Sequence, residues 1–310
     1  MSTDNLSGGG QLTARAAVFA VSSVPGFDFD QAAAQLRSCL GQEVSFARCS
    51  YQGHRALFAR VAPAAHHYPA LHALALAEGC GFDIIYQEIP VSLHRPGMVM
   101  MDMDMTAVQI EGIDELAREL GVYEEVARLT EQAMQGHMDF AQSLRRRVAA
   151  LAGGDADVIR VVRERMPETP GLPELMELLH RHGFQVGIAS GGFTQLISRL
   201  DERYGLDFIR ANTLEVADGR LTGRLCGDIV DASAKAAGFA EMQRQFGLPR
   251  EQTVCLGDGA NDLQMLELAG LGVAYHGKPA VVAAARFCLR CSSLHALSLY
   301  LQCVADSSCS

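Results

Sequence analysis

The chain has 310 residues, of which 49% are hydrophobic and 20% are charged. This composition is typical of a globular protein with a substantial apolar core, and the length predicts two domains. The formal net charge of -10 argues against nucleic acid and against an anionic membrane surface as partners. The sequence shows neither a secretory leader nor an apolar run of transmembrane length, so we expect a cytoplasmic location.

The nine cysteines are irregularly spaced. Cys288 and Cys291 form one C-x-x-C pair, but no second pair or nearby histidine pattern completes a zinc site. We therefore predict ordinary reduced thiols.

The first part of the chain predicts a small α+β domain. Residues 1–11 are polar and glycine-rich and are expected to form a disordered tail. Residues 12–89 follow the order strand, helix, strand, strand, helix, strand, with strands near 12–21, 44–49, 56–61 and 82–89 and helices near 30–40 and 68–78. This βαββαβ order resembles ACT-like regulatory domains in pattern alone, and a spacer or a dimerisation module fits it equally well.

Residues 90–97 contain two prolines and a glycine and are predicted to form a linker, after which the sequence pattern changes. Short apolar strands at 98–102, 184–190, 253–258 and 270–275 predict an α/β fold over 98–310, with a doubly wound parallel sheet as its core. The segment between the first two of these strands contains four helical stretches, near 113–120, 124–134, 140–151 and 158–166. A connection between two parallel strands usually needs only one helix, so we predict an inserted helical cap at about 112–168. Asp218 and Gly219 predict a hairpin turn.

Two acidic residues follow the first strand of this predicted sheet. Asp102 and Asp104 stand two positions apart, and side chains at i and i+2 of a strand begin on the same side. One carboxylate can attack phosphorus, and the other can protonate the leaving oxygen and later activate water. Capping of the next helix would explain the same two acids, so both interpretations stay open for this motif alone.

Two later strands also end in polar motifs. Ser190 and Gly191 stand where a strand passes into a helix, and a hydroxyl with free backbone N–H groups suits phosphate binding there. Asp258, Asn261 and Asp262 offer the hard oxygen atoms that magnesium prefers. A tight glycine turn and an Asx-type turn are the alternatives. Because ligands bind outside the carboxyl ends of parallel strands, the three motifs are expected to meet in one crevice.

Lysine is rare in this chain. Lys235 and Lys278 are the only two among 26 lysine and arginine residues. An ammonium binds phosphate as a compact point charge, whereas a guanidinium presents a planar fork, so Lys235 is a candidate phosphate ligand. Lys278 is equally unusual, but no motif surrounds it.

The order of these motifs resembles the haloacid dehalogenase superfamily and, within it, the phosphoserine phosphatase family. The resemblance covers about residues 97–300 and includes the predicted cap. It implies hydrolysis of O-phospho-L-serine to L-serine and phosphate through a phospho-aspartate, with Mg²⁺ as cofactor, as the last step of L-serine biosynthesis.

The same resemblance assigns roles residue by residue. It makes Asp102 the nucleophile and Asp104 the general acid and base. The implied metal ligands are Asp102, the Asp104 backbone carbonyl and Asp258, with Asp262 in support. The implied substrate-binding residues are Glu111 for the amine, Arg147 for the carboxylate, Met134 and Phe140 for closure, and Ser190, Gly191, Lys235 and Asn261 around the phosphate. Without the resemblance, Glu111 and Arg147 would be read as solvated helix-surface charges.

One residue departs from the family pattern. Met105 stands where the family usually has serine, so a hydroxyl near the nucleophile is lost. We expect activity to survive this change with a shift in rate or substrate choice.

Two other functions fit the sequence. One is a phosphotransferase of the same fold that passes phosphate to an acceptor such as homoserine. The other is an inactive regulatory protein that senses an amino acid through residues 12–89, although the intact motifs argue against it. Homodimer formation and feedback by L-serine both stay open for that N-terminal region.

Overall fold

The computed structural model describes residues 16–135 and 138–306, and the predicted disordered tail lies outside them. The N-terminal elements form an antiparallel sheet in the order β2-β3-β1-β4. They are β1 Ala16–Ser22, α1 Phe29–Leu40, β2 Ala47–Tyr51, β3 His54–Val61, α2 His67–Leu76 and β4 Asp83–Gln87. This is the predicted βαββαβ order, with β2 beginning later than expected.

Every residue of β1 is buried. Because successive strand residues point to opposite faces, complete burial requires cover on both faces of the sheet. Helices α1 and α2 pack against strands of this sheet, and so does α12, which comes from the far end of the described chain. The N-terminal sheet is therefore completed by a helix that the sequence analysis placed outside it.

The second sheet has seven strands in the order β11-β10-β9-β5-β6-β7-β8, parallel except for the β7–β8 pair. Its strands are β5 Met98–Met101, β6 Gln185–Phe193, β7 Phe208–Ala217, β8 Arg220–Cys226, β9 Thr253–Gly257, β10 Leu271–Tyr275 and β11 Phe287–Leu289. The predicted α/β fold with a parallel sheet is confirmed.

Helices cover both faces of this sheet. In β5, Val99 and Met101 belong to one apolar cluster, whereas Met98 and Met100 belong to another. The first cluster includes residues of α7 and α12, and the second includes residues of α9, α10 and α11. The bounds of the helices in this part are α7 Leu172–Arg181, α8 Thr194–Tyr204, α9 Ala232–Gln245, α10 Leu263–Leu268, α11 Pro279–Ala284 and α12 His295–Asp306. The sheet is thus doubly wound.

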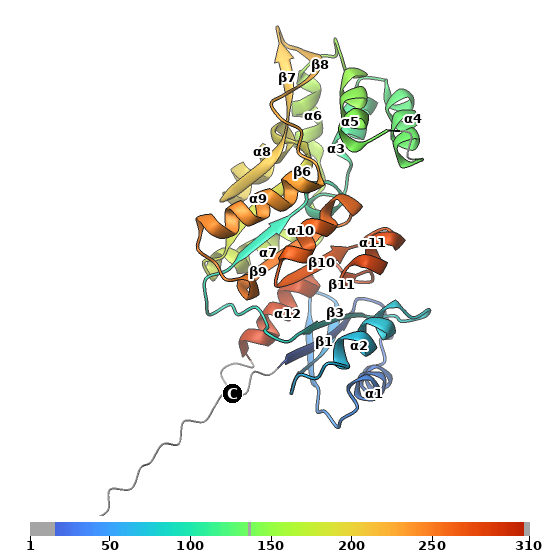
Figure 1. The fold of residues 1–310 in the computed structure, drawn as a ribbon, viewed down its shortest axis with the longest axis vertical. Coiled ribbons are helices and arrows are strands. Elements are labelled where there is room, and N and C mark those ends of the chain that lie inside the picture. The colour runs from blue at the N-terminus through green and yellow to red at the C-terminus, as the bar shows by residue number, and fades with distance from the viewer. Residues whose placement is uncertain (1–15, 136–137, 307–310) are drawn as a thin grey trace, which may run out of the picture.

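Four helices are inserted between β5 and α7, as the sequence predicts. They are α3 Gly112–Glu119, α4 Tyr123–Met134, α5 Phe140–Ala149 and α6 Asp157–Arg165. Helix α5 packs against β8, the second strand of a hairpin. Its turn residues Asp218 and Gly219 both have positive φ, as the predicted Asp-Gly hairpin requires. Figure 1 shows the insertion standing at one end of the large sheet.

The elements that the sequence did not predict are α7, α9, α10, α11, β11 and α12. Helix α12 is apolar on almost every side, so it lacks the periodicity that marks an amphipathic helix. It packs against α7 and against β1, β2 and β3, and Figure 1 shows it between the two sheets. The division of the chain at residues 90–97 therefore stays a prediction. Within the described residues, no helix is long and apolar enough to cross a membrane.

Candidate active site

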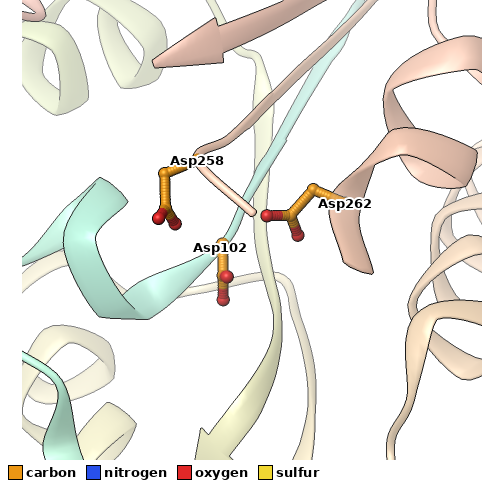
Figure 2. Close-up of side chains that lie close together, drawn as sticks. All are labelled: Asp102, Asp258 and Asp262. Atoms are coloured by element: carbon orange, nitrogen blue, oxygen red, sulfur yellow. The ribbon is translucent and has the colours of Figure 1, made fainter. Parts of the chain in front are cut away.

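The predicted motifs meet at the carboxyl end of the large sheet. Asp102 follows β5 and Asp258 follows β9, and these two strands are neighbours. From β5 the chain continues to β6 on one side and later returns to β9 on the other, which is the type of switch point where such sheets bind ligands. Figure 2 shows the side chains of Asp102, Asp258 and Asp262 close together, Asp102 from the end of β5 and the other two from the segment that follows β9.

A buried ammonium holds two of these carboxylates. Lys235 is completely buried, and its Nζ lies 2.7 Å from Asp102 Oδ2 and 2.8 Å from Asp262 Oδ1. Burial alone lowers the pKa of Lys235, but the two carboxylates outweigh burial and raise the pKa above its usual value. The other Asp102 oxygen accepts a hydrogen bond of 2.7 Å from the Met103 N–H. Asp102 is therefore held in a fixed orientation beside a permanent positive charge.

The acidic cluster suits a divalent cation. One carboxylate oxygen from each of Asp102, Asp258 and Asp262 lies within 4.8 Å of the others. Burial, followed by the charges of Asp102 and Asp262, raises the pKa of Asp258 to about 7. Together, the three carboxyl groups can carry more negative charge than Lys235 alone neutralises. Their oxygen atoms are hard donors, which divalent metals such as Mg²⁺ prefer. Asp262 already bonds to Lys235 and, through Oδ2, to the Gly259 N–H at 2.9 Å, so its oxygens are engaged.

Asp104 lies against the start of the helical insertion. Its Oδ1 accepts a hydrogen bond of 2.9 Å from the Gly112 N–H. Burial raises the pKa of Asp104 well above its usual value, and the neighbouring Glu111 and Asp102 raise it further. A side chain at Gly192 would come within 2.7 Å of the second Asp104 oxygen, which explains the glycine there. Asp104 is therefore a confined carboxyl group close to Asp102.

Ser190, Gly191 and Gly192 lie at the end of β6 and line the same cavity as Asp102 and Asp258. Ser190 is completely buried, and its Oγ accepts a hydrogen bond of 2.9 Å from the Gly192 N–H. A Cβ on Gly191 would lie only 3.0 Å from the Phe140 ring, so the insertion contacts the end of β6. Asn212 Nδ2 donates to Gly191 O at 2.8 Å. Asn212 was not predicted, because its burial and its bond to Gly191 appear only once the segments pack together.

Most of the predicted site residues line one cavity of about 500 Å³. They are Asp102, Asp104, Glu111, Phe140, Arg147, Ser190, Gly191, Asp258 and Asn261. Lys235 and Asp262 lie behind Asp102 instead of lining the cavity. Met134 is the last residue of α4, and its side chain is outside what the structure describes. Lys278, to which the sequence analysis gave no role, also lines the cavity.

The insertion contributes one acid and one unpaired cation to the cavity. Arg147 forms no ion pair with any described residue, and its Nε is buried without a hydrogen-bond partner. Burial lowers the pKa of Arg147, and Glu111, Asp114 and Asp104 partly offset this effect. Burial raises the pKa of Glu111, as does the charge of Asp102, whereas Lys278 and Arg147 lower it. Away from the aspartate cluster, the cavity therefore contains one acidic side chain, Glu111, and one basic side chain, Arg147.

Met105 lies beside the site without lining the cavity. Its φ is 53°, in the left-handed region that a side chain with a Cβ rarely adopts, and 43% of its surface is exposed. The serine that it replaces in the family pattern would occupy the same strained turn. Met105, the residue that departs from the family pattern, is thus close to Asp102 and faces solvent.

Residues 99–267 match the haloacid dehalogenase-like hydrolase family. The chain belongs to this family. Among curated relatives, it is 49% identical to a phosphoserine phosphatase of Vibrio cholerae over 67% of this chain and 63% of the relative. It is 45% identical to that of Streptococcus thermophilus over 60% of this chain and 86% of the relative. The first match spans less than two thirds of the Vibrio cholerae enzyme.

Solved structures of this family have a similar fold. An unliganded crystal structure of the probable phosphoserine phosphatase from Vibrio cholerae covers 94% of this chain and 87% of its own, with a TM-score of 0.75 and 37% identity. A substrate-bound phosphoserine phosphatase complex covers 67% of this chain and 99% of its own, with a TM-score of 0.63 and 36% identity. The first likeness extends over the N-terminal sheet as well as the hydrolase fold.

Proposed function

We propose that this chain is a phosphoserine phosphatase that releases phosphate from O-phospho-L-serine. The observation that carries the proposal is the unpaired Arg147 guanidinium, which shares a cavity with Glu111 on the insertion side and with Asp102 on the sheet side. Phosphoserine carries a carboxylate, an ammonium and a phosphate. The cavity offers a counterpart to each group, and the similarity to phosphoserine phosphatases supports the same substrate.

In the proposed reaction, Asp102 attacks phosphorus and forms an acyl phosphate. Lys235 lies 2.7 Å from Asp102 and offsets negative charge as the phosphate approaches. The Ser190 hydroxyl, the Gly191 N–H and Asn261 hold the phosphate oxygens. The Gly112 N–H positions Asp104, which donates a proton to the serine oxygen as it leaves. Asp104 then takes a proton from the water that hydrolyses the acyl phosphate.

The metal proposed for this site is Mg²⁺. Asp102, the Asp104 backbone carbonyl and Asp258 would hold it, and Asp262 would support the site through Lys235 and the Gly259 N–H. When bound, Mg²⁺ supplies positive charge that reduces repulsion between an anionic nucleophile and an anionic phosphate. Phe140, and by the family resemblance Met134, would close the cavity over the substrate.

Substitutions in the insertion test the substrate assignment. We expect Arg147→Met and Glu111→Gln to lower kcat/KM for O-phospho-L-serine by roughly 10- to 100-fold, the value of a hydrogen bond to a charged group. Activity on an aryl phosphate, which lacks the amine and carboxylate, should change little. Arg146→Met is the matched control, because Arg146 is exposed on the same helix. Equal losses on both substrates would contradict the assignment of Glu111 and Arg147.

The proposal also concerns the cellular location, the oligomeric state and the regulation of the chain. A cytoplasmic location is supported by the eight described cysteines, which are all free. Homodimer formation and feedback by L-serine stay predictions for the N-terminal sheet. The two alternative functions, transfer to an acceptor such as homoserine and inactive sensing, have no observation in their favour.

A further inference from the structure

Near its end, β6 loses its regular pairing with the neighbouring strand β7. The two strands are in register at Ala189 and Arg210 and again at Phe193 and Asn212. The three β6 residues from Ser190 to Gly192 therefore face a single residue of β7, and we call these three the β6 bulge. Because a bulge interrupts the ladder, its backbone groups need partners other than the facing backbone. The β6 bulge also lines the active-site cavity.

The side chain of Asn212 supplies one of these partners. Asn212 is only 1% exposed, and its Nδ2 donates to Gly191 O at 2.8 Å. Its Oδ1 accepts a hydrogen bond of 2.9 Å from the Val230 N–H. A carbonyl can only accept and an N–H can only donate, so these two partners fix which way the amide points. One buried side chain thus joins the β6 bulge to the segment that leads into α9.

The bond to Gly191 O holds one peptide group of the bulge. The N–H of the same peptide group belongs to Gly192 and donates to Ser190 Oγ at 2.9 Å. Because the peptide group is planar and both of its polar atoms are bonded, it cannot turn without losing a hydrogen bond. Ser190 Oγ accepts from Gly192, which leaves the hydroxyl proton of Ser190 available to a ligand in the cavity.

The bond to Val230 holds the start of α9, the helix that carries Lys235. Val230 is followed by the N-cap residue Asp231, whose side chain accepts a hydrogen bond of 2.9 Å from the Ala234 N–H. The Lys235 N–H donates to Asp231 O at 2.9 Å, so Lys235 lies one turn into the helix. The position of this first turn decides where the Lys235 side chain begins, and with it the 2.7 Å contact to Asp102.

We propose that Asn212 is a positioning residue that holds the β6 bulge and the start of α9 in the arrangement that binds the transferred phosphate. Asn212 does not line the cavity, so it acts through other residues. A shift of the bulge would also disturb Asp104, because a Cβ on Gly192 would lie 2.7 Å from Asp104 Oδ2. The inference rests on the phosphatase activity proposed above and concerns only the phosphate part of the substrate.

Asn212→Asp is the first variant that tests this role. The two side chains have nearly the same shape, but the carboxylate places an oxygen where Nδ2 donates to Gly191 O, so this bond is lost. We expect KM for O-phospho-L-serine and the inhibition constant Ki for inorganic phosphate to rise, and kcat/KM to fall by about 100-fold, the scale of a misplaced reacting group. The loss should be equal for an aryl phosphate, because both substrates present a phosphate to the same bulge.

The matched control is Gln195→Glu, the same amide-to-carboxylate change at a second amide that bonds to the β7 backbone. Gln195 Nε2 donates to Leu214 O at 2.7 Å, and Gln195 does not line the cavity. We expect Gln195→Glu to keep the wild-type KM and Ki. A merely structural role for Asn212 would reduce the fraction of folded chain, which lowers kcat and leaves KM and Ki unchanged. That result for Asn212→Asp would overturn the proposal.

Asn212→Ser is the second variant, in case Asn212→Asp does not fold. It buries no charge, and its hydroxyl is too short to bond Gly191 and Val230 together, so we expect a higher Ki here as well. A wild-type Ki in Asn212→Ser would also overturn the proposal.

Calorimetric titration of the full chain with inorganic phosphate, in the presence of Mg²⁺, gives a readout that needs no turnover. We expect weaker phosphate binding in both Asn212 variants and wild-type binding in Gln195→Glu. A wild-type chain that binds phosphate but releases none from either substrate would contradict the proposed function alone, because the affinities of the variants would still decide the role of Asn212. Equal affinities in wild type and both Asn212 variants would overturn that role.

Discussion

At the scale of single residues, Lys235 has the most constrained environment in the site. Its ammonium is fully buried between Asp102 and Asp262. Removing one partner of a buried ion pair leaves an uncompensated charge. We expect Lys235→Met to lower the free energy of unfolding by about 3–5 kcal/mol, measured by urea denaturation in the presence of a chelator. The control is Lys278→Met, at the exposed lysine, where a change within about 0.5 kcal/mol is expected. Similar losses for both variants would contradict this reading of Lys235.

Lys278 has a different expected role, because it is exposed and lines the cavity. A cation at the rim of an acidic cavity attracts an anionic substrate over a distance limited by salt screening. We expect Lys278→Ala to lower kcat/KM for O-phospho-L-serine by up to about tenfold at low ionic strength, with a smaller loss at high salt. Arg286→Ala, at an exposed cation outside the cavity, should leave kcat/KM unchanged. A loss that salt does not reduce would argue for direct contact instead.

At the scale of elements, the β3 residue His54 makes the junction of the two sheets sensitive to pH. Its Nε2 accepts a hydrogen bond of 3.1 Å from the Ser293 N–H, so the ring proton sits on Nδ1, facing Gln52 O. Burial lowers the pKa of His54, and the nearby His295 lowers it further. The folded chain therefore prefers neutral His54, and protonation would break the bond to Ser293.

The sign of the pH effect follows from this preference. When a histidine has a lower pKa in the folded chain than in the unfolded chain, its contribution is complete above the unfolded pKa and is lost as pH falls. We expect the thermal midpoint to fall between about pH 7 and pH 5, around the ordinary histidine pKa of about 6.5. His54→Gln should show a shallower fall, and a slope equal to wild type would exclude His54 as the source.

The sequence predicted the elements that the site is built on. Runs such as Met98–Met101 and the Val254–Leu256 part of β9 are continuously apolar because the sheet is covered on both faces, and polar residues mark where they end. The sequence alone therefore predicts that Asp102 and Asp258 lie at one edge of the sheet. The bond from Gly112 to Asp104 and the amide of Asn212 were not foreseen, because they depend on how distant segments pack.

At the scale of the whole molecule, α12 is the unpredicted element that joins the two sheets. Its partners, Phe19, Gln87 and α7, lie far away in the sequence, and burial on nearly all sides removes the periodic signal of a helix. Because α12 packs on the N-terminal sheet, deletion of this sheet should also affect the part of the chain that remains.

A chain beginning near Pro90 would leave Tyr300 and its apolar neighbours on α12 without their cover. We expect this chain to unfold at a lower temperature than the full chain and to bind a hydrophobic dye, because a large apolar face is exposed. The measurement is thermal unfolding beside size-exclusion chromatography. A truncated chain that stays unaggregated with an unchanged midpoint would show that the N-terminal sheet contributes nothing to stability.

The most direct test of the whole account is phosphate release from O-phospho-L-serine, measured with and without Mg²⁺ beside phosphothreonine and an aryl phosphate. We predict Mg²⁺-dependent release with a strong preference for O-phospho-L-serine, and its loss in Asp102→Asn, which keeps the shape of the nucleophile and removes its charge. Release from the aryl phosphate alone would keep Asp102 as nucleophile and contradict the roles given to Glu111 and Arg147. Undiminished release by Asp102→Asn would contradict the central claim.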